Sequence, residues 1–344
     1  MRLTGPTASI LVTVIASLAS MTAAPAPAAA GDAATRPTAA VVNGRVDHAS
    51  FDAILRSHVH DGLIDYVSLK RRDYQNLLAY LSRLEQIDPA ALSDGERLAM
   101  YCNLYNATMI RVVVDRLHAG YSVAENDKHI FREPLVRLRA GVTSLNHLEH
   151  ELIRKGYPGE YRIHASLVCA GLGCPKIAPR ALRGDGLDAM LDDDMRRWVN
   201  DPSRNTIDRA AGTATLSKLF KFYADDFGGI DKVVPVLDRY TDADLSKTQV
   251  TFAETYDWSL NIAQPTEGQW VKVASPHARI TPWPQEGRDS LVDKDALLEA
   301  GEQRMGMTRV KPIADSGVKN WWISTEDVAP YIAAEHKWQP EKKQ

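Results

Sequence analysis

The sequence predicts an α+β protein in which helices pack on a short antiparallel sheet and a small β-containing region follows at the C-terminal end. Apolar residues recur at helical spacing in several segments between residues 51 and 227. Short β-like runs separated by Pro, Gly and Asp gather after about residue 265. Because 44% of the 344 residues are hydrophobic, the chain has enough apolar side chains to bury a core.

The N-terminal end has the pattern of an export signal. Arg2 precedes a mainly apolar run, Ala8–Met21, and the small residues Ala28–Ala30 follow it, which is the layout of a cleaved secretory signal. The apolar run is too short for a comfortable membrane span. We therefore expect a signal peptide over residues 1–30, a flexible linker over residues 31–47, and a periplasmic or secreted product without stable membrane insertion after cleavage.

The charge of the chain is nearly balanced, with a formal net charge of −3 at pH 7. Such a balance gives no electrostatic case for binding nucleic acid. No motif implies a cofactor, and we expect none. The expected partner is therefore an envelope peptide or a small molecule.

The main domain is expected over residues 48–262, and it opens with helices. Apolar spacing predicts two helices between residues 51 and 84, separated by a short extended piece. Ser93 and Glu96 then form a capping-box pattern, which predicts a long helix that ends near His118.

Shorter elements follow along the main domain. We expect in turn a helix, a strand, a helix, an extended segment and a helix over residues 144–155, 164–168, 187–199, 213–216 and 218–227. Ser217 is expected to cap the last of these helices, and Gly228 to end it.

The C-terminal region, residues 263–344, is expected to be a small β-containing unit. Its β-like runs occupy residues 270–273, 279–281, 308–313 and 318–323. Between them, residues 291–305 have the composition of a charged helix.

Two of the three cysteines lie close together, at the end of the stretch Arg162–Cys174. The expected strand precedes Cys169, and a glycine-containing turn separates it from Cys174, so both sulfurs and His164 should reach one sheet edge. In an exported protein this pair can form a disulfide across a small loop. Cys102 is then left over as a buried, inert thiol.

The same stretch also supplies the parts of a thiol enzyme. A nucleophilic thiolate needs an adjacent imidazole and a group that orients this imidazole. Cys169 or Cys174 is the candidate nucleophile, and His150 or His164 is the candidate base. The supporting polar residues are Asn103, Asn106, Glu149 and Arg162. The disulfide and the nucleophile remain alternatives at this point.

Two of the supporting residues, Asn103 and Asn106, are one helical turn apart and share a face of their helix. A buried amide without partners costs about 1–3 kcal/mol. These side chains must therefore bond either to the backbone of a neighbouring loop or to a catalytic group.

A zinc site is not expected, although histidines lie near the cysteines. His150 and Glu151 begin a zincin-like pattern, but Arg154 stands where the second histidine ligand belongs. His147 and His150 with the two cysteines have spacings that differ from the commoner Cys2His2 sites. Helix-face histidines explain this pattern better than a metal does.

Seven blocks of the chain, in order, resemble the domain-of-unknown-function 547 family over about residues 50–262. The blocks are Asp61–Tyr66, Asn103–Ala107, Ser144–His150, Arg162–His164, Cys169–Pro175, Leu216–Phe227 and Tyr256–Asn261. The resemblance implies this domain and very little about activity.

The layout of helix and histidine strand is also loosely similar to transglutaminase-like and papain-like thiol enzymes. In those enzymes the nucleophilic cysteine opens the helix that here carries Asn103. The similarity implies either a thiol-dependent hydrolase or transferase acting on amide bonds, with its thiol supplied by the Cys169–Cys174 turn, or a non-catalytic binding relative with a structural disulfide. We expect the enzyme as the leading hypothesis.

Overall fold

The computed structural model describes residues 40–265, 269–276, 278–282, 290–305, 307–312, 321–331 and 333. The expected signal peptide and most of the expected linker lie outside these residues. Among the described residues, no helix combines the length and the apolar character that crossing a bilayer requires.

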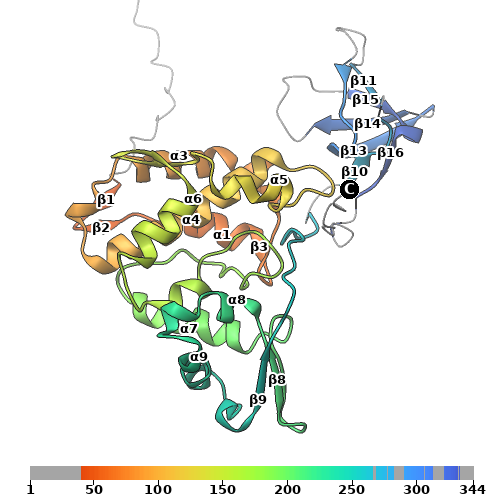
Figure 1. The fold of residues 1–344 in the computed structure, drawn as a ribbon. Coiled ribbons are helices and arrows are strands. Elements are labelled where there is room, and N and C mark those ends of the chain that lie inside the picture. The colour runs from red at the N-terminus through yellow and green to blue at the C-terminus, as the bar shows by residue number, and fades with distance from the viewer. Residues whose placement is uncertain are drawn as a thin grey trace, which may run out of the picture. The chain divides into compact units, whose positions relative to one another are not determined.

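The main domain is mostly helical, as the sequence predicts (Figure 1). Its helices are α1 (Ala49–His58), α2 (Tyr66–Arg72), α3 (Tyr74–Glu85), α4 (Asp94–Arg116), α5 (Glu125–Lys128), α6 (Leu145–His147), α7 (Leu187–Val199), α8 (Lys218–Phe222) and α9 (Ile230–Leu237). A π-helical segment, Leu148–Arg154, continues α6.

The strands form small sheets in the main domain and a larger sheet after it. They are β1 (Val41–Val42), β2 (Arg45–Val46), β3 (Val59–His60), β4 (Leu63–Ile64), β5 (Val136–Leu138), β6 (Gly141–Thr143), β7 (Thr206–Asp208), β8 (Thr213–Leu216), β9 (Gln249–Phe252), β10 (Gln269–Val273), β11 (Arg279–Pro282), β12 (Ser290–Leu291), β13 (Leu297–Arg304), β14 (Met307–Pro312), β15 (Trp321–Ser324) and β16 (Val328–Pro330).

Helix α4 is the centre of the first hydrophobic core. Ser93 caps it, because the Ser93 hydroxyl accepts a hydrogen bond from the Glu96 N–H. Almost every residue from Leu98 to Val114 is buried, since α2, α3 and the π-helical segment all pack against this helix. A helix buried on all sides places its polar side chains against neighbouring segments instead of solvent.

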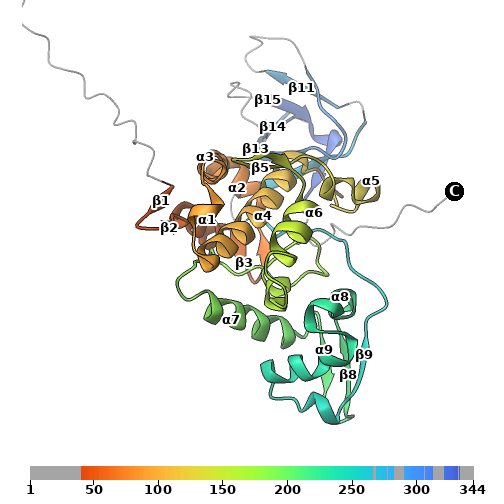
Figure 2. The ribbon, with the colours of Figure 1, turned by 60° about the vertical axis from the view of Figure 1, so that its left-hand side comes forward.

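A second core joins α7, α8 and α9 to the three-stranded sheet (Figure 2). Trp198 of α7 stacks on Phe220 of α8 with ring centroids 3.9 Å apart. In this sheet β7 pairs antiparallel with β8, but β8 pairs parallel with β9. The main domain therefore combines antiparallel hairpins with one mixed sheet.

The described part of the C-terminal region is a seven-stranded sheet in the order β12-β11-β15-β14-β13-β10-β16. The predicted helix over residues 291–305 is wrong, because most of that segment is strand β13. Its Leu, Glu and Ala residues favour helix locally, but β13 pairs with both β10 and β14. Pairing on two edges overrides a weak local preference.

The predicted strand over residues 164–168 is also wrong. Residues Tyr161–Ala165 form a 3₁₀ turn, and every residue from Ile163 to Val168 is buried. His164 and Ser166 resemble the solvent side of a strand in the sequence. They are instead buried with carboxylate partners, Asp226 and Asp194. Polar residues that are buried and paired imitate the alternation of a half-exposed strand.

Two smaller differences concern element boundaries. The described end of the expected linker already forms the β1–β2 hairpin, in which Val46 is buried. The helix expected over residues 218–227 divides at Tyr223 into α8 and a 3₁₀ turn that Gly228 ends with a φ of +90°. This division turns Tyr223 and Asp226 toward the candidate site.

Candidate functional site

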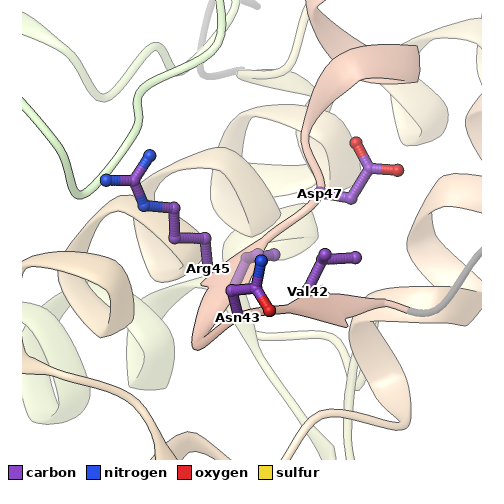
Figure 3. Close-up of a pocket in the computed structure, with 5 residues that line it drawn as sticks. Val42, Asn43, Arg45 and Asp47 are labelled. Atoms are coloured by element: carbon purple, nitrogen blue, oxygen red, sulfur yellow. The ribbon is translucent and has the colours of Figure 1, made fainter.

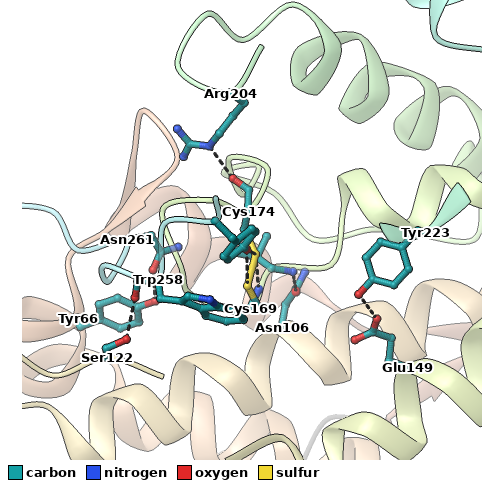
Figure 4. The surroundings of a disulfide bond; sticks show 12 residues. Tyr66, Asn106, Ser122, Glu149, Cys169, Cys174, Arg204, Tyr223, Trp258 and Asn261 are labelled. Carbon is teal, nitrogen blue, oxygen red and sulfur yellow. Dashed lines mark hydrogen bonds between the residues drawn. A yellow bond between two sulfur atoms is a disulfide. The ribbon is translucent and has the colours of Figure 1, made fainter. Parts of the chain in front are cut away.

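The cysteine turn, defined as residues 168–174, holds a disulfide between Cys169 and Cys174 (Figure 4). The two Cα atoms are 6.4 Å apart, within the range that a disulfide spans. Ala170 has a φ of +63°, a left-handed conformation that makes the tight turn between the two sulfurs. The turn is further held by the Cys174 N–H, which donates to the Gly171 carbonyl at 3.1 Å.

Tyr256 covers this disulfide, although no chemical motif in the sequence singles it out. Its hydroxyl lies 3.0 Å from the Sγ atoms of both Cys169 and Cys174. A Cβ at Gly173 would come within 2.7 Å of the Tyr256 ring, so only glycine allows this close approach. Burial raises the pKa of the Tyr256 hydroxyl, which therefore stays protonated and able to donate.

The segment after Tyr256 fixes the turn through the backbone. Leu172 N–H donates to the Ser259 carbonyl and Gly173 N–H donates to the Asp257 carbonyl, each at 2.7 Å. Asn261 N–H donates to the Ala170 carbonyl at 2.9 Å. The position of the turn is thus set by main-chain bonds as well as by its disulfide.

Asn106 holds the other end of the turn. Its Nδ2 donates to the Ser166 carbonyl at 2.8 Å, and its Oδ1 accepts from the Val168 N–H at 2.9 Å. Asn103 makes the same paired contact with both backbone groups of Leu182. These amides satisfy loop backbone, which is the first of the two roles expected for them.

Cys102 lies fully buried on α4. Burial raises the pKa of its thiol, and the negative charges of Glu160 and Asp194 raise it further. A protonated thiol without access to solvent is a poor nucleophile.

One candidate base, His164, belongs to a charged cluster, defined as Glu149, Arg154, His164, Tyr223 and Asp226. The other candidate base, His150, lies beside this cluster. Asp226 Oδ2 accepts from His164 Nε2 at 2.7 Å and from Arg154 Nε at 2.6 Å. Arg154 Nη1 donates to His150 Nδ1 at 2.8 Å. Because a guanidinium can only donate, the Nδ1 lone pair of His150 is occupied.

Asp226 is the charged residue that organises this cluster. Burial favours its neutral form, but hydrogen bonds and charge from His164 and Arg154 outweigh burial and lower the pKa of Asp226 to about 2. The carboxylate is therefore ionised at neutral pH and keeps the His164 ring oriented. That ring stacks on Tyr223 with centroids 3.8 Å apart.

Glu149 is buried at the other end of the cluster. Its Oε1 accepts from the Tyr223 hydroxyl at 2.7 Å (Figure 4), and burial together with the negative charge of Glu149 raises the pKa of the neighbouring Tyr105 phenol. Burial and the Glu149 charge raise the pKa of Tyr223, so this phenol remains a donor. Glu149 is therefore held by the Tyr223 phenol, and this bond does not connect it to a cysteine or an imidazole.

Arg162 does not take part in the cysteine turn and has a separate structural role. Its guanidinium pairs with Glu160 at 2.6 Å, with Asp188 at 2.8 Å and with Asp192 at 3.1 Å. Asp188 and Asp192 belong to α7, so Arg162 ties the 3₁₀ turn before the cysteines to this helix. The residues predicted for one site thus divide among the cysteine turn, the charged cluster and this structural ion pair.

Sequence reasoning missed the partners that complete these groups, namely Tyr223, Asp226 and Tyr256. All three stand inside blocks that carry the family resemblance. No spacing rule connects them to the cysteines, because they come from segments far away along the chain. The resemblance was the one signal that pointed to them.

Other features of the described residues do not add to this site. A pocket of about 610 Å³ is lined by Val42, Asn43, Arg45, Val46 and Asp47 of the β1–β2 hairpin (Figure 3). None of the predicted site residues lines it. Within the described ranges, no group of three or more His, Cys, Asp or Glu side chains is arranged to hold a metal ion.

Comparison with known proteins supports the family resemblance over part of the chain. Residues 89–199 match the family model described as "Protein of unknown function, DUF547". The match includes α4, the charged residues of the π-helical segment, the cysteine turn and α7. No curated protein and no solved structure was found to match the chain. This chain therefore contains a domain of the DUF547 family, whose function is unknown.

Proposed function

We propose that this chain is an exported envelope protein whose main domain binds a peptide or a small molecule and does not use a thiol for catalysis. The observation that carries the proposal is the bond between Cys169 and Cys174. It occupies both candidate nucleophiles, and the remaining cysteine, Cys102, is buried with its thiol protonated. Export to an oxidising compartment, expected from residues 1–30, favours this bridged state.

The other residues that the thiol-enzyme hypothesis requires are bonded to groups other than the cysteines. A catalytic imidazole must take a proton from the nucleophile, but among the described residues the ring of His164 bonds Asp226, the ring of His150 bonds Arg154, and neither ring hydrogen-bonds a cysteine. Asn106 bonds loop backbone and not an imidazole. These contacts favour the binding domain over a thiol-dependent hydrolase or transferase.

Two aromatic side chains beside the disulfide support the proposal of ligand binding. Tyr256 and Trp258 are partly exposed, and their ring centroids are 4.5 Å apart. Lys128 Nζ lies 4.7 Å from the centre of the Trp258 ring. Paired aromatic rings with a cation beside them can bind the flat amide groups and carboxylates of a peptide.

Ligand-observed NMR on the mature protein tests this proposal. The probes are short peptides, including wall-type peptides with free carboxylates, and each mixture is also followed by mass spectrometry for amide cleavage. We expect binding without cleavage, and at least tenfold weaker binding by Trp258→Leu, while Trp198→Phe in the second core serves as a stability control. Cleavage that disappears in Cys174→Ala would instead establish the thiol enzyme.

Export is tested separately from binding. The intact mass of the protein recovered from its producing cells should correspond to cleavage near residue 30. A full-length mass, with Met1 retained and the protein in the cytosolic fraction, would contradict the proposed location.

A further inference from the structure

The two sulfurs of the disulfide lie in unlike surroundings. Cys169 is partly exposed, whereas Cys174 is only 3% exposed. Cys174 Sγ accepts hydrogen bonds from the Cys169 N–H and from the Tyr256 hydroxyl, each at 3.0 Å. The Tyr256 hydroxyl lies equally close to Cys169 Sγ, so the donor that distinguishes the two sulfurs is the Cys169 N–H, which bonds the sulfur of the less exposed cysteine.

We propose that this disulfide is an exchange site, which an external thiol attacks at Cys169 and from which Cys174 leaves as a thiolate. The proposal goes beyond ligand binding, and it rests only on the bridged state that the proposed function assumes. Its substrate class is a thiol, either a small one or the cysteine of a partner protein. A disulfide opens faster when its leaving sulfur is stabilised as a thiolate.

The stabilising groups are arranged around Cys174. The Cys169 N–H and the Tyr256 hydroxyl supply two hydrogen bonds to the sulfur. Arg204 adds a positive charge close by, because its Nε donates to the Cys174 carbonyl at 2.7 Å (Figure 4). Hydrogen bonds and nearby cations favour a thiolate over a thiol.

The exchange balances as an ordinary displacement. The entering thiolate forms a new S–S bond with Cys169 Sγ, the Cys169–Cys174 bond breaks, and its electron pair stays on Cys174 Sγ. Return attack by Cys174 on Cys169 regenerates the disulfide and releases the thiol. With a dithiol, the second thiol completes the reaction, so that the dithiol is oxidised and the protein takes up two electrons and two protons.

The backbone around the turn favours the return step. The carbonyls of Ser259 and Asp257 hold Leu172 and Gly173, and Asn106 holds Val168. None of these bonds involves a sulfur, so they remain when the disulfide opens. They keep Cys174 close to Cys169, which gives the return attack a high effective concentration.

Reaction of the full oxidised chain with excess reduced glutathione tests the proposal. Samples are quenched in acid, treated with N-ethylmaleimide under denaturing conditions, and digested for mass mapping. We expect an intermediate with glutathione on Cys169 and maleimide on Cys174. We also expect Tyr256→Phe to open the disulfide roughly 3- to 10-fold more slowly, since it loses one hydrogen bond to the leaving sulfur. Tyr157→Phe, which loses a hydroxyl bonded to Asp94 and Arg97, is the matched control and should react at the wild-type rate.

Which cysteine carries glutathione in the wild-type protein tests the proposal even if a variant is unstable. Glutathione found on Cys174, opening only after the protein unfolds, or equal rates for Tyr256→Phe and Tyr157→Phe would each overturn the exchange site. If Tyr256→Phe does not fold, Arg204→Gln takes its place and should also react more slowly. Both cysteines free before glutathione is added would contradict the bridged state itself, which separates failure of the proposed function from failure of the exchange.

Discussion

The cysteine turn and the charged cluster contain the same kinds of residue that thiol enzymes use, but they are stabilised in different ways. The turn depends on a covalent bond and on neutral hydrogen bonds to backbone, mainly from Asn106 and the segment after Tyr256. The cluster depends on ionised groups, with Asp226 shared by His164 and Arg154. Residue type alone therefore does not distinguish a catalytic set from a structural one. The identity of each hydrogen-bond partner distinguishes the two.

The largest expected effect concerns the charged cluster. Asp226→Asn removes the carboxylate that pairs with both Arg154 and His164, and it leaves a partly buried guanidinium without its counter-charge. We expect the free energy of unfolding to fall by about 3 kcal/mol, as measured by urea denaturation. Asp225→Asn is the matched control, because Asp225 is exposed and adjacent. Equal losses in both variants would show that the cluster does not depend on this ion pair.

A smaller loss is expected in the cysteine turn. Asn106→Ala leaves the Ser166 carbonyl and the Val168 N–H without partners, which should cost about 2 kcal/mol. Asn103→Ala should cost a similar amount, since it leaves the two backbone groups of Leu182 unpaired. Only Asn106→Ala should also change the rate at which a thiol opens the disulfide. If thiols opened the disulfide at similar rates in the two variants, Asn106 would not be what maintains the geometry of the cysteine turn.

The pH dependence of stability should be determined by the charged cluster and not by the cysteine turn. The pKa of Asp226 is lowered in the folded protein from its ordinary value of 3.8 to about 2, so its contribution is fully present above about pH 4 and is lost as the pH falls toward 2. This contribution is about 2 kcal/mol. Asp226→Asn should remove it, giving a flatter stability profile between pH 4 and pH 2. A stability profile of Asp226→Asn that runs parallel to that of the wild type would contradict the assignment of this pH dependence to Asp226.

The smallest effect is expected at the far end of the cluster. Tyr223→Phe removes the phenol that donates to Glu149 and keeps the ring that stacks on His164. Thermal unfolding should show a loss of about 1 kcal/mol. Phe222→Tyr, at the exposed neighbouring position, should leave the melting temperature unchanged. No difference between these variants would mean that Glu149 does not depend on Tyr223.

The sequence was sufficient for features with a local cause. The Ser93 cap fixes the start of α4, and the apolar spacing of residues 187–199 corresponds to α7. The cost of burying an amide predicted that Asn103 and Asn106 have partners, and loop backbone was one of the two kinds of partner expected. The disulfide could be stated only as one of two alternatives, because the bridge and the nucleophile use the same pair of cysteines.

Features with a distant cause could not be predicted. His164 appears to alternate with apolar neighbours, but its environment is decided by Asp226, which lies sixty-two residues further along the chain. Tyr256 reaches the disulfide from a segment with no chemical motif of its own. Strand β13 forms because two other strands pair with it, against its local helical preference. In each case the deciding interaction is tertiary.

Alkylation of the folded protein without reductant tests the central claim most directly. The protein, recovered from its oxidising compartment, is treated with iodoacetamide, and the labelled cysteines are mapped by mass spectrometry after unfolding and reduction with a second label. The account predicts that Cys169 and Cys174 carry only the second label and that Cys102 is protected until the protein unfolds. Rapid labelling of Cys169 or Cys174 in the folded protein, at a pH well below the ordinary pKa of a thiol, would contradict the bridged state and restore the thiol enzyme.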